Sequence, residues 1–372
     1  MGIFVNRQIT SIFLSILCLY YMSIISTCNG EGRELIANFV FGDSLVDAGN
    51  NNYIAVSISK ANYPPNGIDL GVPTGRFTNG RTTADIIGQQ FGLETFSPPY
   101  LAPTTKGTAI MQGVNYASGA SGILNATGYT FIGRLNFDAQ LDNFANTKQD
   151  LISTIGEEAT NKFIEKALFL VTMGSNDFLS NYLVPFVSIV EQTLVSPQAF
   201  VNQMISKYRL QLTRLRKMGA KKIVVVNVGP IGCIPYTRDI NPLAGSNCVA
   251  FPNYLAQLFN FQLKLLITEL SNNLQGSQFV YADAYRVVSD LLLNYTSYGF
   301  ENANSACCYV SGRYGGLIPC GRTSRTCKDR SKYVFWDPYH PSDAANVLIA
   351  NRFIDGDSSV ISPINIRQLI HS

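Results

Sequence analysis

The chain has 372 residues, of which 46% are hydrophobic and 14% charged, and its formal net charge is +3. This near-neutral balance excludes the basic face of a nucleic-acid-binding protein and the charge blocks of a disordered tail. The low charged fraction and the 30 glycines are typical of a large, loop-rich globular protein. The length alone would allow two domains.

The first segment, residues 1–30, predicts a signal peptide that is removed on secretion. Arg7 is the only charged residue before Glu31, an almost continuous apolar run extends from Ile12 to Ile25, and small residues follow. A membrane anchor is the alternative, but the run is short for a span and lacks a basic cluster on its far side. No other uninterrupted apolar stretch reaches about 18 residues, so we expect a secreted, extracellular protein without stable membrane insertion.

Six of the eight cysteines lie beyond this segment, and an even number in a secreted chain predicts three disulfides. They are Cys233, Cys248, Cys307, Cys308, Cys320 and Cys327. Cys233 and Cys248 form the simplest local pair, and the order of the other two bonds stays open. A zinc site is the competing interpretation, but no Cys-x-x-Cys pair occurs and neither histidine lies among the cysteines. Asn125 and Asn294 begin N-glycosylation acceptor sequences that a secreted chain can use.

Short apolar runs alternate with amphipathic helical patterns along the rest of the chain. The strand-like runs are 35–41, 113–117, 167–173, 222–228 and 278–282. The helical patterns are 83–91, 137–150, 156–166, 197–218, 253–274, 284–293 and 343–354. This alternation indicates an α/β fold with a parallel sheet covered on both faces. No linker or shift in composition divides the pattern, so we predict one domain, 31–372.

The first strand-like run leads into Gly42-Asp43-Ser44. Gly42 permits a sharp turn, and Asp43 and Ser44 are suitable caps for a following helix. A serine at this point lies at the carboxyl end of a parallel strand, where open α/β sheets bind their ligands. The N–H groups of a helix start would favour a developing negative charge there. The alternative is that Ser44 only caps a helix.

Small or polar loops also follow the second and third strand-like runs and contain Gly119 and Asn176. Because the carboxyl ends of parallel strands share one edge of a sheet, these residues should meet Ser44. The alternatives are an ordinary turn glycine and a helix cap. The long irregular segments 46–82 and 97–101 are expected to form two walls of a cleft at this edge.

A serine nucleophile needs a base, usually an imidazole held in one tautomer by a third group. Of the two histidines, His371 is the penultimate residue, where chain ends fray, so His340 is the candidate base. Asp337 lies three residues before it, and Pro338 disfavours a helix at Asp337. The spacing predicts a tight turn in which the carboxylate meets the imidazole. A structural turn with a capping hydrogen bond is the alternative.

The tetrahedral intermediate formed by a serine nucleophile also needs hydrogen-bond donors for its oxyanion, and one such donor is worth about 3–4 kcal/mol. Three donors are available at the expected sheet edge. They are the backbone N–H groups of Ser44 and Gly119 and the side-chain amide of Asn176.

These blocks together resemble the plant GDSL esterase/lipase family, within the SGNH hydrolases. The matching segments, in the order of the family, are 41–52, 113–119, 174–177 and 336–342. The resemblance runs from about residue 35 to about residue 356, which is nearly the whole mature chain. It implies a three-layer α/β/α sandwich with a five-stranded parallel sheet of flavodoxin type. It also implies carboxylic ester hydrolysis without a metal or other cofactor.

The resemblance implies a catalytic role for five residues: Ser44 as nucleophile, His340 as base, Asp337 as orienting acid, and Gly119 and Asn176 in the oxyanion hole. Many relatives have two glycines in the second block, whereas here Ala120 follows Gly119. The N–H of Ala120 could therefore donate instead. Asp43 belongs to the motif, but we expect it to cap or brace the turn rather than to act chemically.

The expected function is that of a secreted serine ester hydrolase acting through an acyl-enzyme, with a role in lipid metabolism. Its substrate would be a small-molecule, lipid or cell-wall ester, and nucleic acid is excluded as a partner. An acyltransferase using the same site is an alternative that sequence does not separate from a hydrolase. A catalytically silent binding protein is a third interpretation, but such a protein would be expected to lack one of the serine, aspartate, histidine or asparagine residues. The natural substrate, acyl-chain preference and oligomeric state do not follow from the sequence.

Overall fold

The computed structural model describes residues 36–184 and 194–372. The expected signal peptide, 1–30, lies outside the described residues. Ile36–Ser372 form one compact unit. Within the described ranges, no helix has the length and apolar character needed to cross a membrane.

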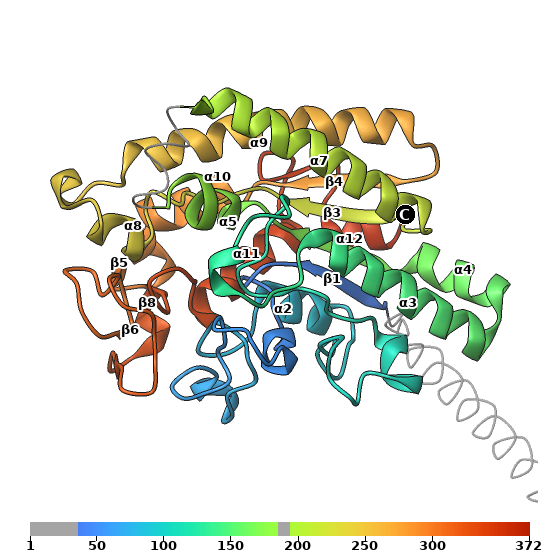
Figure 1. Cartoon of the computed structure of the whole chain (residues 1–372), viewed down its shortest axis with the longest axis horizontal. Helices are drawn as coiled ribbons and strands as arrows, with labels where there is room; N and C mark the ends of the chain where they lie inside the picture. Colours follow the sequence, from blue (N-terminus) through green and yellow to red (C-terminus); the bar gives the residue numbers. More distant parts are fainter. Residues whose placement is uncertain (1–35, 185–193) are drawn as a thin grey trace, which may run out of the picture. The chain divides into compact units, whose positions relative to one another are not determined.

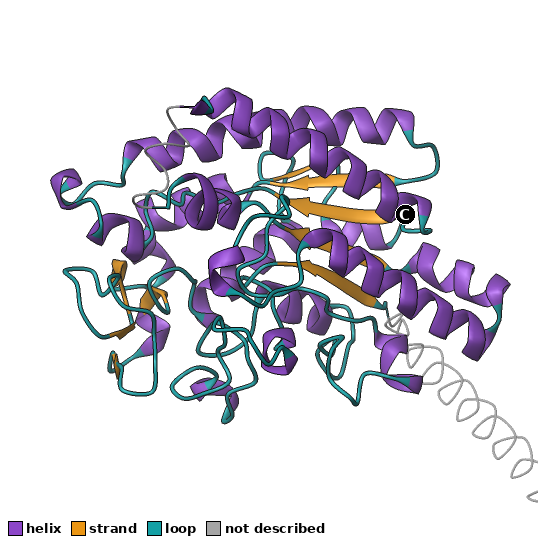
Figure 2. Ribbon diagram, viewed as in Figure 1, coloured by secondary structure: helices purple, strands orange, loops and turns teal. Residues whose placement is uncertain are grey.

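A five-stranded sheet occupies the centre of this unit (Figure 2). Its strands, in spatial order, are β1 (Asn38–Gly42), β2 (Leu168–Thr172), β3 (Lys222–Val226), β4 (Gln278–Ala282) and β9 (Ile361–Ser362). The first four are parallel and level in register, so that Gly42 stands opposite Thr172 and Thr172 opposite Val226. β9 is antiparallel to β4. The fold is therefore α/β with a mixed, mostly parallel sheet.

The prediction of a fifth parallel strand at 113–117 is only partly confirmed. This segment runs parallel to β1, and Tyr116 N–H donates to Val40 O at 2.7 Å, but the pairing amounts to one isolated bridge at Asn115. On its outer side, Asn115 exchanges backbone hydrogen bonds with Pro98 and Tyr100, which belong to a loop. Residues 113–117 therefore have a strand, β1, on one side only and a loop on the other. Counted with the four parallel strands, it gives the chain order 2-1-3-4-5 of flavodoxin-type sheets.

Helices pack on both faces of the sheet (Figure 1). One face is covered by α3 (Phe137–Ile155), α4 (Glu157–Lys166), α7 (Pro197–Lys217) and α9 (Ala250–Asn273). The other is covered by α2 (Thr83–Gln90), α10 (Ala284–Leu293), α11 (Asp343–Asp355) and α12 (Ile366–Ile370). Side chains alternate along a strand, so Phe39 and Phe41 enter the first layer and Val40 enters the second. The seven predicted helical patterns all correspond to helices.

Shorter elements lie in the connections. The helical ones are η1 (Asn50–Tyr53), η2 (Ile68–Leu70), η3 (Gly107–Gln112), η4 (Tyr129–Phe131), α5 (Ser175–Asp177), η5 (Phe178–Tyr182), α8 (Pro235–Asp239), η6 (Pro242–Ala244), η7 (Tyr295–Tyr298) and η8 (Arg330–Lys332). Two small sheets pair β5 (Asn302–Ala306) with β8 (Tyr333–Phe335), and β6 (Cys308–Tyr309) with β7 (Arg325–Thr326). β8 leads directly into the segment that carries Asp337 and His340.

Three disulfides confirm the prediction from the cysteine count. Cys233 bonds to Cys248 as expected, and the open order is resolved as Cys307–Cys327 and Cys308–Cys320. The latter two bonds surround the buried Trp336, and Cys308 N–H donates to Trp336 O at 2.6 Å. The disulfides therefore support the residue next to Asp337.

Candidate active site

The nucleophile candidate, Ser44, lies in a turn directly after β1. Val46 N–H donates to Asp43 O at 3.2 Å, and Leu45 N–H donates to the Asp43 carboxylate at 3.0 Å. The prediction of a helix directly after Ser44 is wrong. The N–H groups of Leu45 and Val46 bond to Asp43 and form a turn, and the next helical residues are those of η1, Asn50–Tyr53. Asp43 braces the turn, as predicted.

Gly42 is required here by space rather than by its φ angle. Its φ lies outside the left-handed region, but a Cβ would stand 2.6 Å from Thr172 O and 2.5 Å from a methyl group of Val46. Because β1, β2 and the turn lie this close together at Gly42, they fix the position of Ser44 relative to the end of the sheet.

Asp337 and His340 occupy a tight turn between β8 and α11. The Asp337 carboxylate accepts the backbone N–H groups of Tyr339 and His340, each at 2.8 Å. The same carboxylate lies 2.8 Å from His340 Nδ1, and His340 Nε2 lies 2.7 Å from Ser44 Oγ. Asp337 and His340 are buried, whereas Ser44 is half-buried. A proton on Nδ1 faces the carboxylate, which leaves Nε2 to accept the hydroxyl proton of Ser44.

The indole of Trp336 anchors this turn. Trp336 is fully buried, and its Nε1–H donates to Asn66 Oδ1 at 2.9 Å. The ring of Phe77 lies against His340 with 5.3 Å between centroids. Asn66 and Phe77 both come from the long irregular segment 46–82, which therefore contacts the site as expected.

Asn176 lies in α5, just past the end of β2. Its side-chain nitrogen donates to Ser121 O at 3.0 Å, and its oxygen accepts the Ser180 hydroxyl at 3.3 Å. These two bonds fix the orientation of the amide. Among the described residues the second N–H of this amide has no partner, so it is available to an oxygen of a bound molecule.

The second-block glycine is held by a carboxylate that sequence reasoning missed. Gly119 N–H donates to Asp47 Oδ2 at 2.9 Å, so the group expected in the oxyanion hole is already engaged. Ala120, the alternative donor, lines the adjoining cavity and has a φ of 69°, which is uncommon for a residue with a Cβ. In the described part of the chain the Ala120 N–H finds no acceptor.

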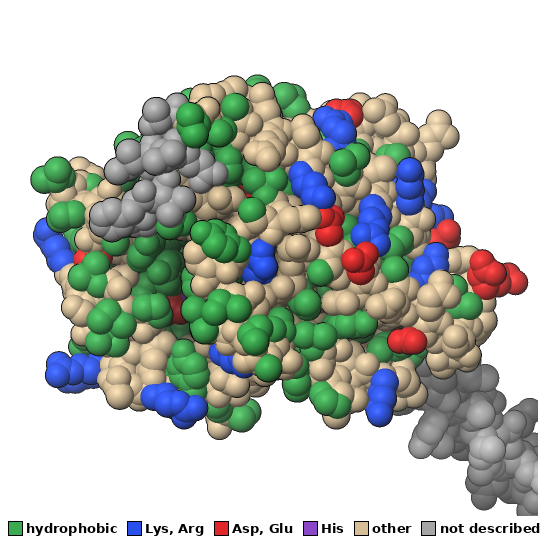
Figure 3. Space-filling view, in the orientation of Figure 1, with side chains coloured by type: hydrophobic (Ala, Val, Ile, Leu, Met, Phe, Trp, Pro, Cys, Tyr) green, Lys and Arg blue, Asp and Glu red, His purple; other side chains and the backbone are tan. Residues whose placement is uncertain are grey.

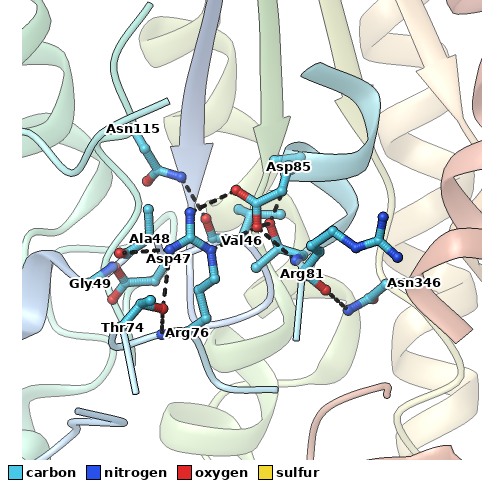
Figure 4. A network of polar contacts seen from close by, with 12 residues as sticks. Val46, Asp47, Ala48, Gly49, Thr74, Arg76, Arg81, Asp85, Asn115 and Asn346 are labelled. Atoms are coloured by element: carbon cyan, nitrogen blue, oxygen red, sulfur yellow. Dashed lines mark hydrogen bonds and ion pairs between the residues drawn. The ribbon is translucent and has the colours of Figure 1, made fainter. Parts of the chain in front are cut away.

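Asp47 belongs to a polar network that supports the turn after Ser44 (Figure 4). Its carboxylate also accepts the N–H groups of Gly49 and Asn50, at 2.7 and 2.8 Å. Beside it, Arg76 forms a two-pronged ion pair with Asp85, with both N–O distances 2.8 Å. No sequence motif predicts this network, since Asp47 contacts Gly119, 72 positions away, and Arg76 and Asp85 lie outside the matching segments. The only sign was an aspartate inside the first block.

Asp177 has a comparable supporting role below Asn176. It accepts the N–H groups of Ile123 and Leu124 at 2.8 and 2.9 Å, and the Thr127 hydroxyl at 2.7 Å. Burial raises the pKa of Asp177 to about 6, although the hydrogen bonds oppose this rise. The carboxylate ties the loop after 113–117 to the end of β2.

Asp43 is the most strongly perturbed of these acids. Burial raises its pKa to about 7, against the lowering effect of the Leu45 N–H. Its Oδ2 is buried and has no hydrogen-bond partner among the described residues. Below about pH 7 the protonated form of Asp43 therefore predominates in the folded protein.

Substitution of Asp43 tests whether its side chain is protonated in the folded protein. Because the pKa of Asp43 in the folded protein exceeds the ordinary aspartate value of 3.8, the folded protein binds an extra proton between about pH 4 and about pH 7. The free energy of unfolding should fall as pH rises through this window, by up to about 1.4 kcal/mol per pH unit. Asp43→Asn should flatten this decline in denaturant titrations at several pH values. Asp142→Asn, at an exposed position, is the control, and equal slopes in wild type and Asp43→Asn would contradict the assignment.

A cavity of about 390 Å³ adjoins Ser44 and His340. Its lining includes Ile58, Tyr63 and Phe77 from the segment 46–82. Figure 3 shows a hollow in the face of the molecule with hydrophobic side chains around it. The expectation that 97–101 forms a second wall is wrong, because this segment pairs with Asn115 beside β1 and does not line the cavity. No group of three metal-ligating side chains occurs within residues 36–184 and 194–372.

Comparison with known proteins places this site in a family. Residues 39–353 match the model of the GDSL-like lipase/acylhydrolase family. The chain belongs to this family. Three GDSL esterase/lipases of Arabidopsis thaliana are 61%, 52% and 47% identical to this GDSL chain. These matches cover 91%, 91% and 98% of the chain, and 92%, 92% and 97% of the relatives.

Proposed function

We propose that this GDSL-family carboxylic ester hydrolase cleaves its substrate with Ser44 as nucleophile, His340 as base and Asp337 as orienting acid. The observation that carries the proposal is the unbroken chain of contacts from Asp337 through His340 to Ser44, at the side of a cavity. Nucleophile, base and orienting group within hydrogen-bond reach of one another are the signature of an activated serine.

The reaction runs in two steps. Ser44 Oγ attacks the ester carbonyl carbon while His340 Nε2 takes the hydroxyl proton, and Asp337 stabilises the imidazolium. The bond to the alcohol then breaks, and His340 gives its proton to the departing oxygen. Water attacks the acyl-enzyme with His340 again as base. Ser44 recovers its proton as the carboxylic acid leaves.

The oxyanion would be held by Ser44 N–H, Ala120 N–H and the Asn176 amide. We assign Ala120 in place of Gly119 because Gly119 N–H already donates to Asp47, whereas Ala120 lines the cavity. Preorganised donors of this kind stabilise the charge that develops on the carbonyl oxygen. Asp47 and Asp177 would act as positioning residues for the loop that carries Ala120.

Secretion is part of the proposal. Three disulfides are typical of an oxidising, extracellular environment. Asn125 and Asn294, the acceptor asparagines, are both exposed and so accessible to N-glycans. The relatives are named esterase/lipase, which supports a lipid or other small ester as substrate and a role in lipid metabolism.

A serine-reactive phosphonate tests the assignment of Ser44. A p-nitrophenyl alkylphosphonate should lose p-nitrophenol and form a phosphorus–oxygen bond to Ser44, and peptide mapping by mass spectrometry should find one adduct there. Denatured protein is the control and should remain unlabelled, because the hydroxyl then lacks its base. An adduct on another serine, or esterase activity that survives complete labelling of Ser44, would overturn the assignment.

A further inference from the structure

Four large apolar side chains are exposed together at the edge of the cavity. They are Val56, Ile58, Tyr129 and Ile132, each 62–66% exposed, and we call them the apolar rim. The two segments that carry them lie side by side, because Ile58 N–H donates to Phe131 O at 3.4 Å. Ile58 and Phe131 also line the cavity that adjoins Ser44. The apolar rim therefore borders the end of this cavity that is open to solvent.

Hydrogen bonds tie both segments of the apolar rim to neighbouring loops. The buried Asn51 amide donates to Ser59 O at 2.8 Å and to Gly119 O at 3.0 Å. On the other segment, Arg134 Nε–H donates to Thr127 O at 2.8 Å. The apolar side chains of the rim therefore project into solvent from backbone that is already bonded in place.

Ile132 has a backbone conformation that isoleucine rarely adopts. Its φ is 65° and its ψ is −62°, and across it Gly133 N–H donates to Phe131 O at 2.8 Å. This is a γ-turn of the rare, strained form, and a β-branched residue with positive φ is an outlier. Packing within the protein offsets little of this strain, because the side chain is 63% exposed. A contact outside the chain would explain why an isoleucine is held there.

The charges around the apolar rim are of one sign. The stretches 49–68 and 118–137, which carry the rim, contain no aspartate or glutamate, and their charged residues are Lys60 and Arg134. Across the ranges that the structure describes, neither of these two forms an ion pair with a carboxylate. Apolar side chains flanked by cations are complementary to a surface with an apolar interior and negative charge outside.

We propose that the apolar rim docks the protein on a lipid surface that carries anionic headgroups. The rim side chains enter the boundary between headgroups and acyl chains, and Lys60 and Arg134 face the headgroups. A lipid surface needs neither a shape match nor directional hydrogen bonds, so a few side chains on turns suffice for it. Once docked, the cavity opens toward the lipid, and a lipid ester enters without crossing water. This delivery of substrate rests on the proposed function, whereas the docking itself does not.

Co-sedimentation with sucrose-loaded vesicles tests the docking without turnover. The secreted protein is used after removal of N-glycans, because Asn125 O accepts a hydrogen bond from Arg134 and lies beside the rim, and intact mass confirms that 1–30 are absent. We expect binding to phosphatidylcholine–phosphatidylglycerol vesicles (3:1) to be about tenfold tighter than binding to phosphatidylcholine alone, since each cation gains several-fold at an anionic surface. High salt should remove this difference.

A double variant, Val56→Ser with Ile132→Gly, removes two side chains of the apolar rim. Its partitioning onto the mixed vesicles should fall by about tenfold. Because glycine relieves the γ-turn, the thermal midpoint of Ile132→Gly should be no lower than that of wild type. Neither position lines the cavity, so kcat/KM for soluble p-nitrophenyl acetate should stay at the wild-type value. Tyr129→Ser is a second rim variant, for use if the double variant fails to fold.

Leu265→Ser is the matched control. Leu265 is 57% exposed, lies on α9 and does not line the cavity, so vesicle binding should not change. A wild type that does not bind the mixed vesicles, or equal binding by wild type and the double variant, would overturn the proposal. So would a dimer in sedimentation velocity that dissociates in the double variant without any vesicle binding, which would assign the rim to a second copy of the chain. Ser44→Ala should bind vesicles like wild type, so failure of the catalytic assignment leaves this test unaffected.

Discussion

Ser44→Ala is expected to lower kcat/KM for a p-nitrophenyl ester by about 10⁴-fold or more. The variant retains the turn after β1, because Asp43, rather than the Ser44 side chain, accepts the Leu45 N–H. It removes the only hydroxyl that lies 2.7 Å from His340 Nε2 in the described structure. The loss should therefore appear in the rate and leave the thermal midpoint close to that of wild type.

A double variant makes the test sharper. If Ser44 and His340 act as one unit, His340→Ala should cost about as much as Ser44→Ala, and the double variant should be no slower than either single variant. Additive losses would show that the two residues contribute separately. Retained activity in Ser44→Ala would rule out Ser44 as the nucleophile.

Arg76→Met is expected to destabilise the protein by about 3–5 kcal/mol, because it leaves the Asp85 carboxylate buried without its partner. Arg76 and Asp85 are almost fully buried, and Asp85 also accepts the N–H and hydroxyl of Thr82 at the start of α2. Arg76 further donates to Thr74 Oγ1 at 3.1 Å (Figure 4). Equilibrium unfolding in denaturant measures the loss.

Two further variants show how much of the destabilisation comes from the unpaired Asp85 carboxylate and how much depends on the burial of the ion pair. Arg76→Met combined with Asp85→Asn removes the stranded charge, so it should be more stable than Arg76→Met alone. Arg367→Met breaks an ion pair of similar two-pronged geometry with Asp355, but this pair is exposed, so the cost should be about 0–1 kcal/mol. Similar losses in Arg76→Met and Arg367→Met would show that burial of the pair does not determine its energetic importance.

The main elements of the fold could be predicted because their signals are local. Buried strands and amphipathic helices each leave a periodic pattern, and the four parallel strands and the seven predicted helices follow it. β9 could not be found this way, since Ile361–Ser362 is too short to carry a period. The weak pairing of 113–117 also depends on a loop contact at Asn115 that has no local signal.

The candidate site likewise contains residues that a local motif predicts and contacts that no local signal predicts. Ser44, Asp337, His340 and Asn176 were identified from motifs that each occupy a few consecutive residues, and the structure brings Ser44, Asp337 and His340 within hydrogen-bonding reach. The bond from Gly119 to Asp47 joins residues 72 positions apart, so nothing near Gly119 in the sequence reveals it. Likewise, the unexpected turn after Ser44 results from how the Asp43 carboxylate is used, which helix propensity does not describe.

The separation of Ser44 and His340 along the chain has a consequence for biosynthesis. The two residues are 296 positions apart, and His340 is held by a turn that follows the last disulfide-bonded cysteine. If Ser44 is the nucleophile and His340 the base, as proposed, a growing polypeptide carries the first long before it carries the second. On that proposal, ester-cleaving activity arises only once nearly all of the chain has been synthesised and folded, and a product truncated before His340 is expected to be inert.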